Sequence, residues 1–326
     1  MNARRLGKTG YQVSEIGFGA WGIGADWGEV DDSESMAAVH AAVDAGVTFI
    51  DTADVYGDGR SERLVGRLLR ERPEPLVVAT KFGRRVPLDV SLYTYDNFRS
   101  WIERSRENLG VETIDLVQLH CLPWETYYTP SAFDACDRLV DEGLVGAYGV
   151  SVEKVEEALK AIEYPGVATI QIIFNMFRQR PAELFLREAA KRDVGVIVRV
   201  PLASGLLTGK FGHDARFAGD DHRSYNRHGE SFDVGETFSG VDFETGVEAV
   251  EELRPLLPKE ATLAQLALRW ILDFDAVSTT IPGAKTAEQA RMNAAAAELP
   301  PLSAATHDAI ADLYRRRIAP LVHQRW

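Results

Sequence analysis

Cysteine is scarce in this chain of 326 residues, which contains only Cys121 and Cys136. Cys121 ends an apolar stretch with strand character, and Cys136 falls within a helical pattern. Two thiols in so long a chain indicate buried, reduced cysteines rather than a disulfide-stabilised fold. We therefore expect the protein to work in a reducing compartment.

Long apolar runs are also missing. No uninterrupted run approaches the roughly 18 residues of a transmembrane helix, and the first residues, Met-Asn-Ala-Arg-Arg-Leu-Gly, lack the apolar segment of a secretory signal. The formal net charge of −13 disfavours non-specific binding to nucleic acid or to an anionic membrane. The sequence predicts a soluble, cytoplasmic protein that has neither nucleic acid nor membrane as a partner.

The chain does contain a regular alternation of helical patterns with short apolar runs rich in β-branched residues. The runs end near residue 17 and span 48–51, 76–81, 115–120, 145–150, 167–172, 194–200 and 277–281. Eight such runs, apolar on both faces, are typical of an α/β fold of the (β/α)8 TIM barrel type. A polar hairpin at 4–16 precedes the first run, and extra helices, 286–297 and 303–317, follow the last.

We expect a single domain over residues 1–326, because no linker or shift in composition divides the chain. A doubly wound sheet with a second domain is the structural alternative. Residues 211–240 follow the seventh run without any periodicity, which favours a lid or cofactor clasp over an ordinary connection. The histidines and aspartates of this segment lack a recognisable ligand spacing, so we predict no metal site there.

A glycine-rich segment near the N-terminus, Gly17-Phe-Gly-Ala-Trp-Gly22, matches the dinucleotide-binding fingerprint letter for letter. That fingerprint acts by placing a pyrophosphate at the start of a helix that begins at once. Here no helical pattern begins before about residue 33. We interpret the segment as a loop at the barrel mouth that carries Trp21 and Trp27.

Four polar residues lie at or just after the ends of the second, third and fourth runs: Asp51, Tyr56, Lys81 and His120. Taken singly, each has an ordinary interpretation, such as a turn cap, a strand-end cation or a hydrogen-bonded core histidine. In a parallel barrel, however, the carboxyl ends of the strands meet at one face, which is where such folds carry their chemistry. We therefore expect the four side chains to lie together.

This set of side chains suits the reduction of a carbonyl group. A reductase needs an acid that protonates the carbonyl oxygen, and Tyr56 can serve if a nearby ammonium favours its ionised form and lowers its pKa from about 10. Lys81 would supply that ammonium, and Asp51 would hold Lys81 through an ion pair. His120 would orient and polarise the carbonyl by hydrogen bonding.

These residues lie in motifs that resemble those of the aldo-keto reductase family, and the resemblance covers nearly the whole chain. The motifs are Asp51-Thr-Ala-Asp-Val-Tyr-Gly57 with Ser61-Glu62, Ala79-Thr-Lys-Phe82, Asp115-Leu-Val-Gln-Leu-His120 and Gly205-Leu-Leu-Thr-Gly-Lys210. The resemblance, to a bacterial member near the channel β-subunit branch, implies that Tyr56 is the general acid and that Asp51, Lys81 and His120 complete a tetrad. It also implies NADPH as cofactor and a small aldehyde or ketone as substrate.

A cofactor-phosphate site is indicated separately, because barrels often bind phosphate in the loops after strands seven and eight. The first loop lacks the length and the Ser/Thr of a P-loop, so a pyrophosphate clamp is the better interpretation. After the eighth run, Thr286 is a candidate helix cap with Gln289 three residues on, which puts Lys285 beside free amide groups. The candidate residues of the two loops are Pro201, Leu202, Ala203, Gly205, Thr208, Lys210, Gly283 and Lys285.

The resemblance adds further cofactor and substrate positions. Lys285 would meet the 2′-phosphate of NADP, Gln289 and Asn293 the adenine end, and Ser151 and Gln171 the nicotinamide carboxamide. Trp21 matches a substrate-pocket position, and Trp124 lies in another mouth loop.

Two positions depart from the family pattern: Val152 replaces a frequent Asn, and Arg199 replaces a frequent aromatic that stacks on the nicotinamide. A cation there would disfavour the positively charged oxidised ring, so we expect a preference for reduced cofactor.

Two other functions are compatible with parts of this pattern. Lys81 could form a Schiff base in an aldolase or isomerase barrel, although a carboxylate partner such as Asp51 disfavours the neutral amine that this requires. A redox-sensing subunit that keeps its cofactor and turns over little is the other alternative, which the complete tetrad disfavours.

Overall fold

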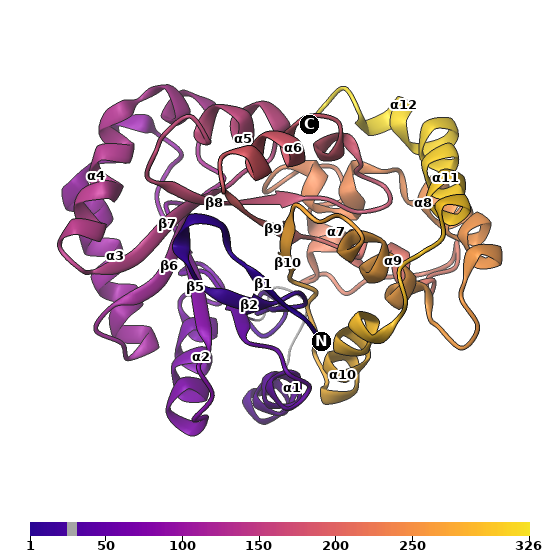
Figure 1. Ribbon diagram of the computed structural model, residues 1–326, viewed down its shortest axis with the longest axis horizontal. Helices are drawn as coiled ribbons and strands as arrows, with labels where there is room; N and C mark the ends of the chain where they lie inside the picture. The colour runs from indigo at the N-terminus through magenta and orange to yellow at the C-terminus, as the bar shows by residue number, and fades with distance from the viewer. Residues whose placement is uncertain (25–30) are drawn as a thin grey trace.

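The computed structural model describes residues 1–24 and 31–326, so the predicted mouth-loop residue Trp27 lies outside the described part. Eight parallel strands pair in sequence order from β3 to β10. Parallel bridges from Ile16 to Thr280 and from Gly19 to Gly283 join the two edges of this sheet. The predicted (β/α)8 barrel is confirmed, and Figure 1 shows its helices arranged around the central strands.

The strands match the predicted apolar runs to within a few residues. They are β3 Phe18–Gly19, β4 Phe49–Asp51, β5 Val77–Phe82, β6 Ile114–His120, β7 Val145–Ser151, β8 Val167–Ile173, β9 Gly195–Arg199 and β10 Val277–Thr280. Every residue of β8 and β9 is buried. Continuous burial is what a parallel strand experiences when barrel interior and helix layer cover its two faces.

The helices form the outer layer, and side-chain caps begin several of them. They are α1 Asp32–Asp44, α2 Arg60–Glu71, α3 Tyr95–Leu109, α4 Pro130–Asp141, α5 Val155–Ala161, α6 Phe185–Lys191, α8 Phe243–Leu253, α9 Leu263–Leu272, α10 Ala287–Ala295, α11 Ala304–Leu313 and α12 Ala319–Val322. Thr94, Thr262 and Ser303 each accept a hydrogen bond from the amide three residues on. Such caps satisfy amides that the first helical turn leaves without partners.

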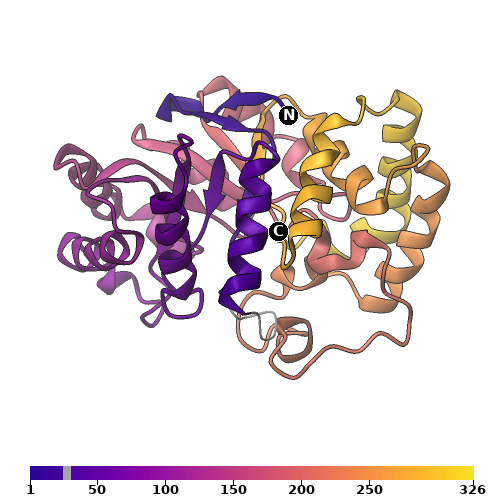
Figure 2. The ribbon, with the colours of Figure 1, turned by 90° about the horizontal axis from the view of Figure 1, so that it is seen from below.

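The predicted N-terminal hairpin closes the end of the barrel that lies opposite the carboxyl ends of the strands. Strands β1 Ala3–Arg5 and β2 Gln12–Ser14 are antiparallel and turn through Gly10, which has a left-handed φ of 77°. Leu6 and Val13 are fully buried against the small and branched side chains that fill the barrel interior. Figure 2 shows the hairpin at one end of the molecule and the orange loop segment at the other.

Three helices differ from their predicted ranges by more than two residues. Helical patterns predict helices over 152–162 and 181–191, and α5 and α6 begin three and four residues later, at Val155 and Phe185. Pro181 sits in a 3-10 turn, Arg180–Ala182, because its ring and missing N–H suit the start of a turn. The predicted helix 303–317 leaves regular α-helix after Leu313 and continues as a π-helical turn before α12.

Residues 211–240 contain only short elements: α7 His222–Tyr225 and the 3-10 turns Val234–Glu236 and Phe238–Gly240. No helix among the described residues combines the length and the apolar character needed to cross a membrane.

Candidate active site

A cavity of about 440 Å³ opens at the carboxyl ends of the strands. This volume lies within the range of about 300–1,000 Å³ that small-molecule sites occupy. Asp51, Tyr56 and His120 line it together with Trp21. Three of the four polar residues singled out in the sequence therefore face one cavity, and the fourth, Lys81, lies directly behind them.

Lys81 connects the ends of strands β4 and β5. Its ammonium donates to Asp51 Oδ2 at 2.5 Å, to the Thr52 carbonyl oxygen at 2.8 Å and to the Tyr56 hydroxyl oxygen at 3.3 Å. The side chains of Lys81 and Asp51 are only 1% and 3% exposed. The buried charge is thus matched by one carboxylate and hydrogen-bonded to two further oxygens, as a buried ammonium requires.

The electrostatics of this group differ in one respect from the sequence-based expectation. Burial is the largest influence and, with Asp51 and Glu236, outweighs the Lys81 ammonium, so the pKa of Tyr56 is raised to about 12. Lys81 itself lowers the pKa of Tyr56, as expected, but does not bring it toward neutrality. The net lowering predicted from the sequence is wrong, because burial disfavours the ionised form of the phenol more than the Lys81 ammonium favours it.

The same interactions fix the charge of Lys81. Burial lowers the pKa of Lys81, but the Asp51 carboxylate and the Tyr56 oxygen outweigh it and raise the pKa above its ordinary value. Lys81 therefore remains a cation, and Tyr56 remains a protonated phenol, throughout the physiological range.

His120 and Trp21 flank the Tyr56 ring. The His120 ring meets Tyr56 edge-on with centroids 6.0 Å apart, and the Trp21 ring stacks on Tyr56 at the same separation. Burial, with the nearby cations of Arg84, Lys81 and Arg199, holds the pKa of His120 well below its usual value. His120 is therefore a neutral imidazole, which can donate one hydrogen bond to a carbonyl oxygen.

Two glutamines, Gln118 in β6 and Gln171 in β8, complete the hydrogen-bond network around Asp51. Gln171 Nε2 donates to Asp51 Oδ1 at 2.7 Å, and Gln118 Nε2 donates to the same oxygen at 3.2 Å. Gln118 was not predicted as a site residue, although it pairs with Lys81 in the register of β5 and β6 and stands two residues before His120. Its position in the polar end of an otherwise apolar strand was the signal available.

The loops after β9 and β10 form the long wall of the cavity. All but one of the predicted cofactor residues line the cavity: Ser151, Gln171, Arg199, Pro201, Leu202, Gly205, Thr208, Lys210, Gly283, Lys285, Gln289 and Asn293. The exception is Ala203, which is fully buried. Ser204 and Gly205 take left-handed φ angles of 54° and 96° in this loop. The turn so formed leads the chain along the cavity rather than away from it.

The start of helix α10 supplies the polar end of this wall. Thr286 accepts from the Gln289 amide at 3.2 Å, and Gln289 Oε1 accepts from the Lys285 amide at 2.8 Å. Asn293 Nδ2 donates to the Gly283 carbonyl oxygen at 3.1 Å, which fixes the loop. The cations of Lys210, Lys285 and Arg223 line the same cavity, and Arg223 is paired with Asp221 at 2.6 Å. A helix N-terminus beside several cations fits the phosphates of a dinucleotide.

Arg199 is not a lone cation. Its guanidinium donates to Glu153 Oε2 at 2.8 Å and to the Val152 carbonyl oxygen at 3.1 Å, and lies 3.8 Å from Glu236 Oε2. This corrects our expectation from the sequence, because two carboxylates match a charge that we had taken as unpaired. The electrostatic reason to expect a preference for reduced cofactor is thereby lost.

Some residues lie elsewhere than predicted, and others were missed. Trp124 is 60% exposed, packs edge-on against Tyr128 and is absent from the described cavity lining. Its place in the substrate pocket therefore stays a prediction. Glu236 and Arg223 enter the cavity from the segment 211–240, where the sequence carries no periodic signal that could have identified them.

The comparisons with known proteins agree with this geometry. The Aldo/keto reductase family model matches residues 15–315. The chain belongs to the aldo-keto reductase family, a family of oxidoreductases.

Three proteins illustrate what the chain is similar to. Aldo-keto reductase YhdN of Bacillus subtilis is 30% identical over 87% of this chain and 85% of its own length. The glycerol dehydrogenase AKR11B4 of Gluconobacter oxydans is 31% identical, with a TM-score of 0.79 over 97% of this chain and 96% of that one. An aldo/keto reductase of Klebsiella pneumoniae, solved with NADP and acetate, has the same fold, with a TM-score of 0.71 at 22% identity over 96% of each chain.

The pair of buried charges gives a testable prediction for stability. Asp51→Asn removes the counter-charge of Lys81 and leaves the ammonium buried, so we expect a loss of about 3–5 kcal/mol in the free energy of unfolding, measured by urea denaturation. The double variant Asp51→Asn with Lys81→Met should recover part of that loss, because it removes both charges. Equal losses in the single and the double variant would contradict the pairing.

Proposed function

We propose that this protein reduces an aldehyde or ketone with NADPH, and that Tyr56 protonates the carbonyl oxygen. The observation that carries the proposal is the buried contact among Asp51, Lys81 and the Tyr56 hydroxyl, beside a cavity that Lys285 and Lys210 also line. NADPH, when bound, supplies the hydride; the protein's own side chains supply the proton and the orientation.

The tetrad residues divide the work on the substrate. Neutral His120 donates a hydrogen bond that orients and polarises the carbonyl group. Tyr56 holds the proton that the carbonyl oxygen receives, and its high pKa keeps that proton in place at neutral pH. As the proton leaves, the Lys81 ammonium stabilises the charge that develops on the phenolic oxygen, which lies 3.3 Å away.

The other end of the cavity suits the cofactor. Lys285, the N-terminus of α10 and Lys210 would hold phosphate groups, with Gln289 and Asn293 beside the adenine. Ser151 and Gln171, at the ends of β7 and β8, would hold the nicotinamide carboxamide near Tyr56. Ligand titration of the Lys285 variant described below tests the phosphate end of this arrangement separately from turnover.

A Schiff base on Lys81 is disfavoured by the same geometry. The ion pair with Asp51 raises the pKa of Lys81, whereas nucleophilic attack on a carbonyl needs the neutral amine. Lys81 also does not line the described cavity.

Replacing Tyr56 by Phe removes the acid and little else, because the ring still packs against Trp21 and His120. We expect turnover of aldehydes to fall by about 10²–10⁴ while NADPH binding changes little. Steady-state NADPH consumption and fluorescence titration measure the two quantities. Retention of turnover in Tyr56→Phe would remove Tyr56 from the mechanism.

Replacing Lys285 by Ala tests the cofactor-phosphate end. If its ammonium meets the 2′-phosphate, NADPH affinity should fall about tenfold to a hundredfold, the effect of losing a charge-assisted hydrogen bond, while NADH affinity is unchanged. The exposed Lys259, which lies outside the described cavity lining, provides the matched control Lys259→Ala. Equal weakening of NADPH and NADH in Lys285→Ala would refute the assignment.

A further inference from the structure

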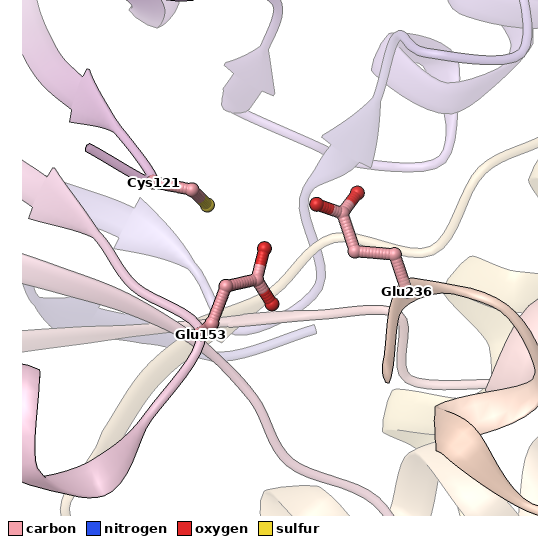
Figure 3. A group of neighbouring side chains, drawn as sticks. All are labelled: Cys121, Glu153 and Glu236. Atoms are coloured by element: carbon pink, nitrogen blue, oxygen red, sulfur yellow. The ribbon is translucent and has the colours of Figure 1, made fainter. Parts of the chain in front are cut away.

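Beside the tetrad, a second buried group of side chains remains unexplained by the proposed reaction. Cys121, Glu153 and Glu236 converge so closely that one ligand atom from each lies within 4.8 Å of the others. Figure 3 shows their side chains pointing toward one another from separate segments of the chain. Of the three, only Glu236 is among the described residues that line the cavity, where it joins Tyr56 and His120.

Arginines already pair with both carboxylates of this group, so a metal ion would have to displace them. Arg84 Nη1 lies 3.0 Å from Glu236 Oε1, and Arg199 donates to Glu153 Oε2 and lies 3.6 Å from Cys121 Sγ. Burial raises the pKa of the Cys121 thiol well above its usual value, whereas a metal ligand would be the thiolate. The group is therefore an arginine–carboxylate network.

Within this network, Glu236 carries the negative charge. Burial alone would raise the pKa of Glu236, but the cations of Arg84 and Arg199 outweigh burial and lower it below its ordinary value. Burial, together with the neighbouring Glu236 carboxylate, outweighs the Arg199 cation and raises the pKa of Glu153. A fixed, ionised carboxylate thus borders the space next to Tyr56.

Trp326 holds the turn that carries Glu236. The indole Nε1 donates to Asp233 Oδ1 at 2.9 Å, and the Arg178 guanidinium lies 3.8 Å from the centre of the indole ring. A Cβ atom at Gly235 would lie 2.9 Å from the indole and 2.6 Å from Arg178, so this position has no room for a side chain. The backbone before Glu236 is therefore packed against a rigid aromatic surface, and the carboxylate is preorganised.

We propose that Glu236 selects the substrate class: uncharged carbonyl compounds that carry a hydroxyl group close to the carbonyl, with exclusion of compounds that carry a carboxylate there. The inference rests on the proposed carbonyl reduction at Tyr56.

Its physical reason is the acceptor capacity of the carboxylate. Each carboxylate oxygen has two lone pairs, so Glu236 can accept a substrate hydroxyl while Arg84 remains bound. Such a charge-assisted hydrogen bond is about twice as strong as a neutral one. An anionic substrate would instead bring another carboxylate against Glu236, where Arg84 and Arg199 are already engaged by Glu236 and Glu153, and like charges at close range repel.

Paired aldehydes measure both parts of the proposal. Glyceraldehyde and propanal share a three-carbon chain and differ in hydroxyl groups, whereas succinic semialdehyde and butanal share a four-carbon chain and differ in a carboxylate. With rates referred to the free carbonyl concentration, wild-type kcat/KM should favour glyceraldehyde over propanal and butanal over succinic semialdehyde. Equal values within both pairs would overturn the inference while leaving carbonyl reduction intact. No NADPH oxidation with any aldehyde would instead refute the proposed function.

The variant Glu236→Gln keeps the shape of the side chain and removes its charge. We expect the glyceraldehyde preference to fall about tenfold, the loss of one charge-assisted hydrogen bond. Succinic semialdehyde should gain relative to butanal, because Arg84 and Arg199 lose a counter-charge. Unchanged ratios, or an equal loss for all four aldehydes, would overturn the role of Glu236.

Glu153→Gln is the matched control, because it alters the same network outside the described cavity lining. Both substrate ratios should stay at their wild-type values in this variant. The same shift in Glu153→Gln and Glu236→Gln would assign the effect to the network and refute selection by Glu236.

If Glu236→Gln fails to fold, Glu236→Asp provides the test. This variant keeps the negative charge that pairs with Arg84 but shortens the side chain by one methylene. The hydroxyl preference should then weaken while carboxylates remain excluded. An unchanged hydroxyl preference in Glu236→Asp would contradict the inference.

Discussion

The ion pair between Lys81 and Asp51 is the interaction on which the site depends. Two unlike charges about 4 Å apart attract by about 4 kcal/mol at an effective dielectric of 20, and burial of either charge alone costs several kcal/mol. The pair is therefore tolerable only if strands β4 and β5 are adjacent, in the observed register, and the barrel is closed around them. The Thr52 carbonyl oxygen accepts a further hydrogen bond from Lys81, and Gln118 and Gln171 donate to the second oxygen of Asp51.

The ion pair also sets the chemical state of its neighbours. Because Asp51 neutralises Lys81, Tyr56 sits in a buried site without net positive charge and keeps its proton. A second network, in which Arg84 and Arg199 face Glu153 and Glu236, borders the same cavity and repeats the principle of buried arginines matched by carboxylates. The first network surrounds the reacting proton, and the second holds Glu236, the carboxylate that we propose selects the substrate.

Sequence patterns predict the barrel well because its strands are buried on both faces and its helices carry caps, and both features are local. They also predict the tetrad, because Asp51, Lys81 and His120 each end a recognisable strand. They fail where geometry depends on distant segments. Glu236 comes from a segment without periodicity, and its contacts with Arg84 and Arg199 cross the barrel mouth. The charge of Arg199 and the pKa of Tyr56 were misjudged for the same reason, since burial and distant partners determine both.

The pH dependence of the two reaction directions in the wild-type protein tests the central claim most directly. A Tyr56 phenol with a pKa of about 12 and a neutral His120 predict a flat kcat for carbonyl reduction from about pH 6 to 9. Oxidation of the corresponding alcohol, which needs the phenolate, should rise with pH over the same range without a plateau. A reduction rate that falls with an apparent pKa near 7 would show that Tyr56 ionises there, and would contradict the account of how the buried ion pair controls the acid.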